Sequence, residues 1–241
     1  MIASVTRDVV RVPQRFCGPP QSGNGGYTCG ILAKTFTDAA AVECTIRKPI
    51  PIERDLRIEV EQNSARLIDD DNVVIEAVVC DVELQLPQPI SWEEAGQAVS
   101  KSPAFENHPF PTCFVCGPDR DDHDGLRLFP GADQEQSGFE NLFAARWVPA
   151  EEFAESGIVQ PEFVWAAMDC PTGFAAGFPW AGKLVTGRLA VKLVAPLAAE
   201  SNCIVQSWSL GTEGRKCHAG AVLRGESGDV YAIAKATWIK I

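Results

Sequence analysis

The chain has 241 residues, of which 46% are hydrophobic and 22% are charged, a composition typical of a globular protein with a substantial core. Its formal net charge of −11 at pH 7 argues against nucleic acid as the main partner, because phosphate binding needs a surplus of Lys and Arg on some surface. The sequence has no run of about 18 apolar residues and reaches charge early, at Arg7 and Asp8, so we expect a cytoplasmic protein with neither an export signal nor a membrane span.

The nine cysteines are an odd number, and they are scattered through apparent strands and helices. Cysteines in such positions are typical of reduced residues that serve as small apolar side chains. We therefore expect no framework of disulfide bonds.

The first predicted element is a helix over residues 27–36, directly after Asn24-Gly25-Gly26. Segments of β-branched and aromatic residues then predict three strands, over 41–46, 56–61 and 73–86. A connection marked by prolines follows, and it contains a short helix over 91–99. Ser91 and Glu94 form a plausible capping box at the start of that helix.

The second half begins with a predicted strand over 142–148. A helix then starts at Pro161, a favoured first helical residue, and runs to Asp169 before Pro171 disturbs it. This helix is apolar nearly all round, as expected for a helix wrapped by a sheet. Four further strands are predicted, over 184–194, 203–210, 217–224 and 230–241.

The two halves share one order of elements. In each, a helix is followed by a proline (Pro49 or Pro196) and, seven residues later, by a strand that begins at Leu56 or Cys203. This common spacing predicts a duplicated module, although identity between the halves is low. The predicted units are a first module over 1–90, a linker with a short helix over 91–109 and a second module over 110–241.

Several segments carry a resemblance to a known family. They are Phe16-Cys17-Gly18-Pro19-Pro20, Asn24-Gly25-Gly26-Tyr27, Cys113-Phe114-Val115-Cys116-Gly117-Pro118, Gly125-Leu126-Arg127-Leu128 and Val164-Trp165-Ala166-Ala167-Met168-Asp169-Cys170-Pro171. Together they resemble the acyl-CoA thioesterase superfamily of hotdog proteins, in its PaaI-like branch, with two modules fused in one chain. The resemblance implies an α+β double hotdog, in which two antiparallel sheets each wrap a central helix and join edge to edge. It also implies a homo-oligomer that hydrolyses an acyl-CoA or acyl-carrier thioester, with no cofactor.

Thioester hydrolysis needs a group that activates water or attacks the carbonyl carbon, and donors that stabilise the developing oxyanion. Asp169 is the only acidic residue in the apolar body of its helix, where a carboxylate must be hydrogen-bonded, exposed in a cleft or shifted in pKa. Its alternative role is to satisfy the kink made by Pro171.

Asn24-Gly25 is also a hairpin-turn signal. A helix-like stretch follows it, however, which favours glycines that let a helix start approach a ligand closely.

In related single-module enzymes the helix often begins His-Gly-Gly and carries an acid about nine positions later, and each site takes one feature from each of two helices. Here Ala33 stands nine positions after Asn24, and Gln160 stands nine before Asp169. If the helices are antiparallel, Asn24-Gly25-Gly26 meets Asp169 at one site, and the other site has lost both features. The resemblance implies that Asp169 activates water or acts as nucleophile, the N–H of Gly25 or Gly26 polarises the carbonyl, and Asn24 orients substrate.

Further candidates for substrate contact belong to or follow the segments that carry the resemblance, or carry positive charge. Tyr27 and Trp165 lie within those segments and Thr172 follows Pro171, although Trp165, like Trp208 and Trp238, is more typical of a core aromatic. Arg215 and Lys216, with Arg188 on a neighbouring predicted strand, could meet coenzyme A phosphates. A solvated strand edge explains these three equally well.

Cys113-x-x-Cys116, with His108 and His123 nearby in the sequence, is weak evidence for a metal, because a structural zinc site usually has four ligands. We expect no metal.

Two other functions stay open. A hydratase or dehydratase on this fold usually needs a catalytic His, and the three histidines, including His218, lie outside the two central helices. A non-catalytic acyl-thioester binder is the second alternative, because the His of the related enzymes is missing.

Overall fold

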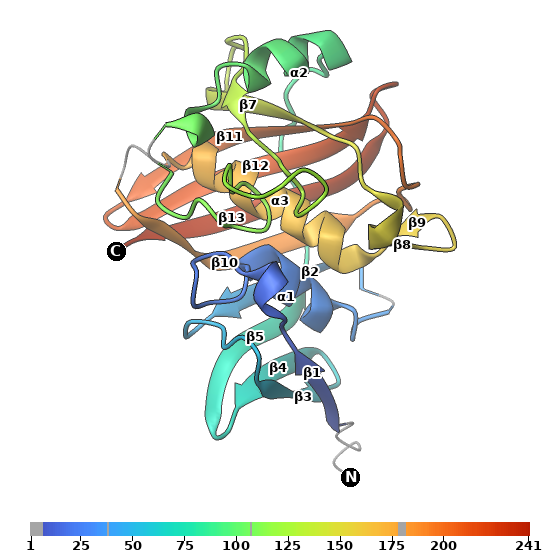
Figure 1. The fold of residues 1–241 in the computed structure, drawn as a ribbon, viewed down its shortest axis with the longest axis vertical. Coiled ribbons are helices and arrows are strands. Elements are labelled where there is room, and N and C mark those ends of the chain that lie inside the picture. The colour runs from blue at the N-terminus through green and yellow to red at the C-terminus, as the bar shows by residue number, and fades with distance from the viewer. Residues whose placement is uncertain (1–6, 38, 107, 178–181) are drawn as a thin grey trace.

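The computed structural model describes residues 7–37, 39–106, 108–177 and 182–241. Within these residues the chain is an α+β protein built on one eleven-stranded sheet, whose neighbouring strands all pair antiparallel. Two helices, α1 and α3, lie against each other and against the sheet (Figure 1). A separate two-stranded ribbon, β8–β9, precedes α3.

The N-terminal half supplies one central helix and five strands of the large sheet. They are β1 (Arg7–Arg11), α1 (Gly25–Ala33), β2 (Ala41–Ile46), β3 (Asp55–Glu61), β4 (Ser64–Asp69) and β5 (Asn72–Cys80). A single turn of 3-10 helix, Gln14–Phe16, precedes α1.

The rest of the chain supplies two helices, the small ribbon and six strands of the large sheet. They are α2 (Trp92–Val99), β6 (Gly131–Ala132), β7 (Glu140–Trp147), β8 (Ala154–Glu155), β9 (Ile158–Val159), α3 (Pro161–Ala175), β10 (Leu184–Leu193), β11 (Cys203–Glu213), β12 (Lys216–Gly225) and β13 (Val230–Lys240). Two further 3-10 turns, Pro103–Phe105 and Glu151–Phe153, lie in the connections.

The strand order repeats on the two sides of the sheet. The order is β1-β3-β4-β5-β2-β10-β13-β12-β11-β7-β6. Counting outward from the centre, β2-β5-β4-β3-β1 on one side corresponds to β10-β13-β12-β11-β7 on the other. Each side also contributes one of the two central helices. The arrangement is therefore two-fold in its strand order, with α1 and α3 at the centre.

Hydrogen bonding between β2 and β10 joins the two sides. Thr45 pairs with Arg188, and Val42 pairs with Val191 at the other end of the ladder. The two sheets expected from the sequence are therefore one continuous sheet, because their edge strands meet in an uninterrupted antiparallel ladder.

The two central helices run antiparallel and in very close contact. A Cβ on Gly26 would lie 2.5 Å from Asp169 Cβ, and a Cβ on Gly30 would lie 2.5 Å from Glu162 Cα. Increasing residue numbers in α1 thus meet decreasing numbers in α3. Glycine at these two positions lets the backbones approach within a distance that any other side chain would prevent.

Pro171 lies inside α3 rather than ending it, which corrects the sequence prediction. The helix is buried from Phe163 to Ala175, so packing against the sheet on one side and α1 on the other offsets the roughly 3 kcal/mol that an internal proline costs. Nearby hydrogen bonds also satisfy polar groups at this point. Thr172 Oγ1 donates to the Asp169 carbonyl at 2.6 Å, and Ser207 Oγ donates to the Pro171 carbonyl at 2.8 Å.

In the second half, the face of the sheet opposite the central helices is covered by the connection between the halves. Leu84 packs there against Trp208 and Val222, while α2 packs its alanines against Ala144 and Ile204. The predicted capping box at the start of α2 is present. The strand predicted over 73–86 ends at Cys80, because the chain leaves the sheet there to cross this face.

Three strands of the large sheet escaped prediction. One is β6, which has two residues, and the others are β1 and β4, whose sequences mix charged residues with only a few apolar ones (RDVVR and SARLID). All nine cysteines are free, and all but Cys80 are buried, as expected of reduced residues. Among the helices of the described residues, none has the length and apolar character that a membrane crossing requires.

Candidate active site

A cavity of about 580 Å³ opens where the two halves meet. Its wall is formed by the start of α1, the second half of α3, the first residues of β10 and the last residues of β13. The segments around residues 46–50 and 113–116 complete it. Most of the lining is apolar, including Ile46, Ile50, Phe110, Phe174, Leu184, Val185, Trp238 and Ile239. An apolar cavity with a few polar groups is typical of a small-molecule site.

Asp169 is the acidic residue that lines this cavity. It is 1% exposed, and both carboxylate oxygens are hydrogen-bonded: Gly26 N–H donates to Oδ2 at 2.8 Å, and Thr186 Oγ1 donates to Oδ1 at 2.8 Å. The carboxylate therefore reaches across to α1 and β10 rather than back to the helix at Pro171. The alternative in which Asp169 satisfies the proline kink has no support from these contacts.

Burial controls the protonation of this carboxyl. Desolvation raises the pKa of Asp169 to about 7, although the hydrogen bonds from Gly26 and Thr186 oppose the shift. The side chain can therefore take up and release a proton near neutral pH, which an ordinary surface aspartate cannot do.

The start of α1 presents its first N–H groups toward this carboxylate and the cavity. Asn24 is the N-cap, and its Oδ1 accepts from Tyr27 N–H at 2.9 Å. Gly26 N–H is already donated to Asp169. Gly25 N–H, the first of the N–H groups that have no intrahelical carbonyl, has no acceptor among the described residues, and Gly25 lines the cavity.

These contacts narrow the sequence prediction for the oxyanion donor from two glycines to one. Gly26 N–H holds the carboxylate, so Gly25 N–H is the donor left for a ligand in the cavity. The Asn24 side chain is 2% exposed and caps α1, while its Nδ2 lies 3.9 Å from the sulfurs of Cys113 and Cys170. Asn24 therefore holds the start of α1, and because it also lines the cavity, its role in orienting substrate stays a prediction.

The sequence-predicted substrate contacts lie elsewhere, since none of Tyr27, Trp165, Thr172, Arg188, Arg215 and Lys216 is among the described residues that line the cavity. Tyr27 stacks on Phe16 with 4.1 Å between ring centroids, Trp165 is 2% exposed between the helices, and Thr172 accepts from Trp238 Nε1. Arg188 pairs with Glu43 at the seam of the sheet. Arg215 and Lys216 are exposed at the turn between β11 and β12.

Sequence reasoning missed the cations at the rim of the cavity and one hydrogen-bond partner of Asp169. Arg47 and Lys48 are exposed and belong to the lining, so they stand at the rim. Thr186 was also missed, because its role depends on the β10 register that brings it to Asp169, and no local pattern marks it.

The pseudo-equivalent position, at the start of α3, differs in its residues. Ala33 and Gln160 stand where the first site has Asp169 and Asn24, and Lys34 Nζ reaches across to Gln160 Oε1 at 3.5 Å and to Glu162 Oε1 at 3.2 Å. A cluster of aromatic rings packs nearby, made of Phe16, Tyr27, Phe114, Phe153 and Phe163. The features needed for an acid-assisted site are therefore gathered at one of the two positions.

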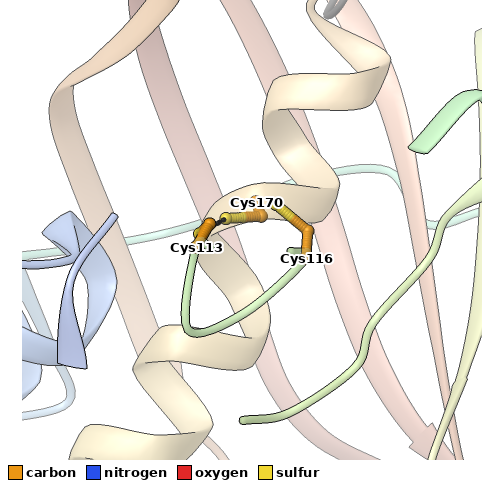
Figure 2. A group of neighbouring side chains, drawn as sticks. All are labelled: Cys113, Cys116 and Cys170. Carbon is orange, nitrogen blue, oxygen red and sulfur yellow. Dashed lines mark hydrogen bonds between the residues drawn. The ribbon is translucent and has the colours of Figure 1, made fainter. Parts of the chain in front are cut away.

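Three cysteines line the cavity beside Asp169, and Figure 2 shows their side chains converging from two segments. Cys113 and Cys116 come from a turn before β6, and Cys170 comes from α3. Hydrogen bonds from the Cys116 and Cys170 thiols, and from the backbone N–H groups of Cys116 and Val115, hold the pKa of the Cys113 thiol well below its usual value. Cys170 is the member that the sequence pattern did not reveal.

The three histidines lie outside this site. None of them is among the described residues that line the cavity. His108 Nδ1 accepts from Phe110 N–H at 3.0 Å, and His218 Nδ1 contacts Thr237 Oγ1 at 3.1 Å between β12 and β13. This placement disfavours chemistry that needs a histidine base next to Asp169.

Comparison with known proteins finds likeness in structure. No protein-family model matches the sequence, and no curated protein matches it significantly. An acyl-CoA thioesterase II from Mycobacterium marinum gives a TM-score of 0.63 at 10% identity, over 99% of this chain and 96% of that one. The tesB protein of Mycobacterium avium subspecies paratuberculosis gives 0.62 at 13% identity, over 98% of this chain and 95% of that one.

A third solved structure names the architecture. A conserved protein with a hot dog fold from Alicyclobacillus acidocaldarius gives a TM-score of 0.57 at 9% identity, over 98% of this chain and 95% of that one. At such identities the likeness concerns the fold, and it extends over nearly the whole length of each protein. The chain therefore has the hotdog fold, which it shares with these proteins over nearly its full length.

Proposed function

We propose that this protein is a hydrolase of acyl thioesters, with acyl-CoA as the first substrate class to test, and that Asp169 assists the attack of water. One observation carries the proposal: a buried carboxylate, fixed by Gly26 N–H and Thr186 Oγ1, faces an apolar cavity beside the start of a helix. The fold shared with solved thioesterases supports it.

The proposed reaction uses three groups of the cavity. The Asp169 carboxylate accepts a proton from a water molecule as the water oxygen attacks the thioester carbonyl carbon. Gly25 N–H, at the positive end of the α1 dipole, donates to the carbonyl oxygen on which negative charge develops. The C–S bond then breaks, and the proton held by Asp169 goes to the departing thiolate. Asn24 keeps the start of α1 in place.

The cavity suits both parts of an acyl-CoA molecule. Its apolar wall can hold an acyl chain, while Arg47 and Lys48 at the rim offer positive charge to phosphate groups. Arg47 is paired with Glu76 at 2.6 Å, and Lys48 contacts Asn72 Oδ1. Lys48 is therefore the rim cation without an acidic partner among the described residues, and we propose it as a phosphate contact.

Charge reversal at the rim is expected to weaken substrate binding and spare the chemical step. Lys48→Glu should raise KM for an acyl-CoA about 5-fold or more at low ionic strength and leave kcat nearly unchanged, because Lys48 is exposed at the rim whereas Asp169 is buried. Lys216→Glu, at the turn outside the cavity, is the matched control. Steady-state kinetics at two salt concentrations measure the effect, and equal KM values for the two variants would remove Lys48 from the phosphate site.

Loss of the Thr186 hydroxyl should slow hydrolysis and leave the fold intact. Thr186→Val removes one of the two donors that fix the Asp169 carboxylate, at a cost of about 1.4 kcal/mol, so kcat should fall roughly 10-fold. Thr237→Val, on the adjacent strand β13, is the control because its hydroxyl contacts His218 instead. An unchanged kcat in Thr186→Val would show that this hydrogen bond does not position the base.

A non-catalytic acyl-thioester binder is the second candidate. It is favoured by Asn24, which stands where related enzymes carry a histidine and whose side chain is already engaged in capping. Incubation with a panel of acyl-CoA esters, with products separated by chromatography, distinguishes the candidates. A thiol reagent is less suitable, because the chain itself has nine cysteines. Binding without turnover would favour the binder, and hydration of an enoyl-CoA would favour a hydratase.

We further propose that the chain is a fused double hotdog, with modules at 1–90 and 110–241 and a linker at 91–109. The strand order that repeats on the two sides of the sheet supports this division. In that arrangement each module supplies one helix to the site, as two separate chains would in a dimer. We propose a cytoplasmic homo-oligomer, since each end of the sheet leaves an edge strand, β1 or β6, that can pair further.

A further inference from the structure

We infer that Cys113, Cys116 and Cys170 form a binding site for a thiophilic divalent cation, Zn²⁺, in the wall of the cavity. The three sulfurs lie within 4.8 Å of one another, and all three residues are buried. Figure 2 shows the side chains of the turn and of α3 pointing at one another. The inference does not depend on the proposed hydrolase function.

The spacing of the sulfurs fits tetrahedral zinc. A Zn–S bond of about 2.3 Å with tetrahedral angles places sulfur ligands about 3.8 Å apart. The Cys113 and Cys170 sulfurs are 3.7 Å apart, and the remaining separations need contractions of at most about 1 Å, within the reach of small side-chain rotations. Because the three residues line the cavity, the fourth ligand position faces it and is open to water.

The surroundings supply donors to thiolate ligands. Asn24 Nδ2 lies 3.9 Å from the sulfurs of both Cys113 and Cys170. Hydrogen bonds of this kind orient metal ligands and spread the charge of the sulfur. Cys-x-x-Cys in a tight turn is also a common way to present two zinc ligands.

Charge and softness select the cation. Thiolate ligands favour Zn²⁺ or Cu⁺ over Mg²⁺ and Ca²⁺, which prefer oxygen. Three thiolates with Zn²⁺ carry a net charge of −1, whereas with Cu⁺ they carry −2, and burying the larger charge costs more. Zn²⁺ is therefore the ion expected at this site.

The third ligand distinguishes this assignment from the sequence pattern. Cys113-x-x-Cys116 alone supplies two ligands, and neither His108 nor His123 belongs to the cluster. Cys170 completes it from α3, directly after Asp169 in the chain. A bound cation would link the turn at 113–116 to α3 and so fix this wall of the cavity.

The test measures metal binding without reference to activity. The full chain, reduced and freed of metal with a chelator, is titrated with Co²⁺ and then with Zn²⁺. We expect one equivalent of Co²⁺ to give the sulfur-to-cobalt charge-transfer absorption and strong visible bands of a tetrahedral thiolate site, and Zn²⁺ to abolish them. X-ray absorption of the zinc form should show about three sulfur neighbours near about 2.3 Å.

Single substitutions assign the ligands. Cys116→Ser and Cys170→Ser should each weaken Zn²⁺ binding at least 10-fold, and Cys80→Ser, outside the cluster, should bind like the unaltered chain. Circular dichroism of each variant checks that it folds. If a variant fails to fold, the Co²⁺ spectrum and X-ray absorption of the unaltered chain still decide the question. A spectrum without thiolate bands, or oxidation of Cys113 and Cys170 to a disulfide as the only chemistry of the cluster, would overturn the assignment.

Discussion

Asp169→Asn is expected to lower kcat/KM for acyl-thioester hydrolysis by about 10³-fold, because an amide cannot accept the proton of the attacking water. The fold should survive the change. An asparagine can direct its Oδ1 to Gly26 N–H and its NH₂ to Thr186 Oγ1, which can accept, so both contacts are kept. The substitution also removes the cost of burying a carboxylate.

Asp133→Asn provides the matched control for this variant. Asp133 is also a partly buried carboxyl with a raised pKa, caused mainly by burial, and Gln206 Nε2 donates to its Oδ2 at 3.1 Å. It lies outside the described lining of the cavity, so its replacement should leave hydrolysis nearly unchanged. Parallel thermal unfolding of both variants separates loss of chemistry from loss of fold. Full activity in Asp169→Asn would remove Asp169 from the mechanism.

The meeting of Asp169 with the start of α1 could be predicted because the family that the sequence resembles builds each site from one feature of each of two helices. One acid in an apolar helix and a glycine pair before another helix supplied those two features, and the prediction assumed that the helices are antiparallel. The strands were also found where β-branched residues are dense. The β1 and β4 strands were missed because their charged residues obscure the alternation of apolar and polar side chains that predicts a strand. Pairing with neighbouring strands stabilises them.

The rest of the site depends on contacts between distant segments. Cys170 meets Cys113 only because the turn at 113–116 folds onto α3, and no spacing within either segment reveals that contact. The same holds for the rim, where Lys48 in the loop after β2 reaches the cavity while Lys216 does not. The sequence prediction named Lys216 and not Lys48, and only the position of the loop in the fold shows that Lys48 is the one of the two that lines the cavity.

Gly26→Ala is expected to lower the free energy of unfolding by roughly 3 kcal/mol, near the upper end of what an added core methyl usually costs. The new Cβ would lie 2.6 Å from the Trp165 carbonyl oxygen and 2.9 Å from Ala166 Cα. These atoms belong to the α3 backbone, which cannot rotate away, so the helices must separate along their contact. The better helix propensity of alanine, worth about 1 kcal/mol, offsets only part of this cost.

Gly25→Ala is the matched control, one residue away in the same helix. Its Cβ would lie 3.1 Å from Ile46 Cδ1 and from Thr186, whose side chains can shift by the few tenths of an ångström required. Denaturant unfolding should therefore show a large loss for Gly26→Ala and a small one for Gly25→Ala. Because separated helices also lengthen the bond from residue 26 N–H to Asp169, residual hydrolysis by folded Gly26→Ala should fall as well. Equal stability of the two variants would mean that the close approach of α1 and α3 is not what the glycine provides.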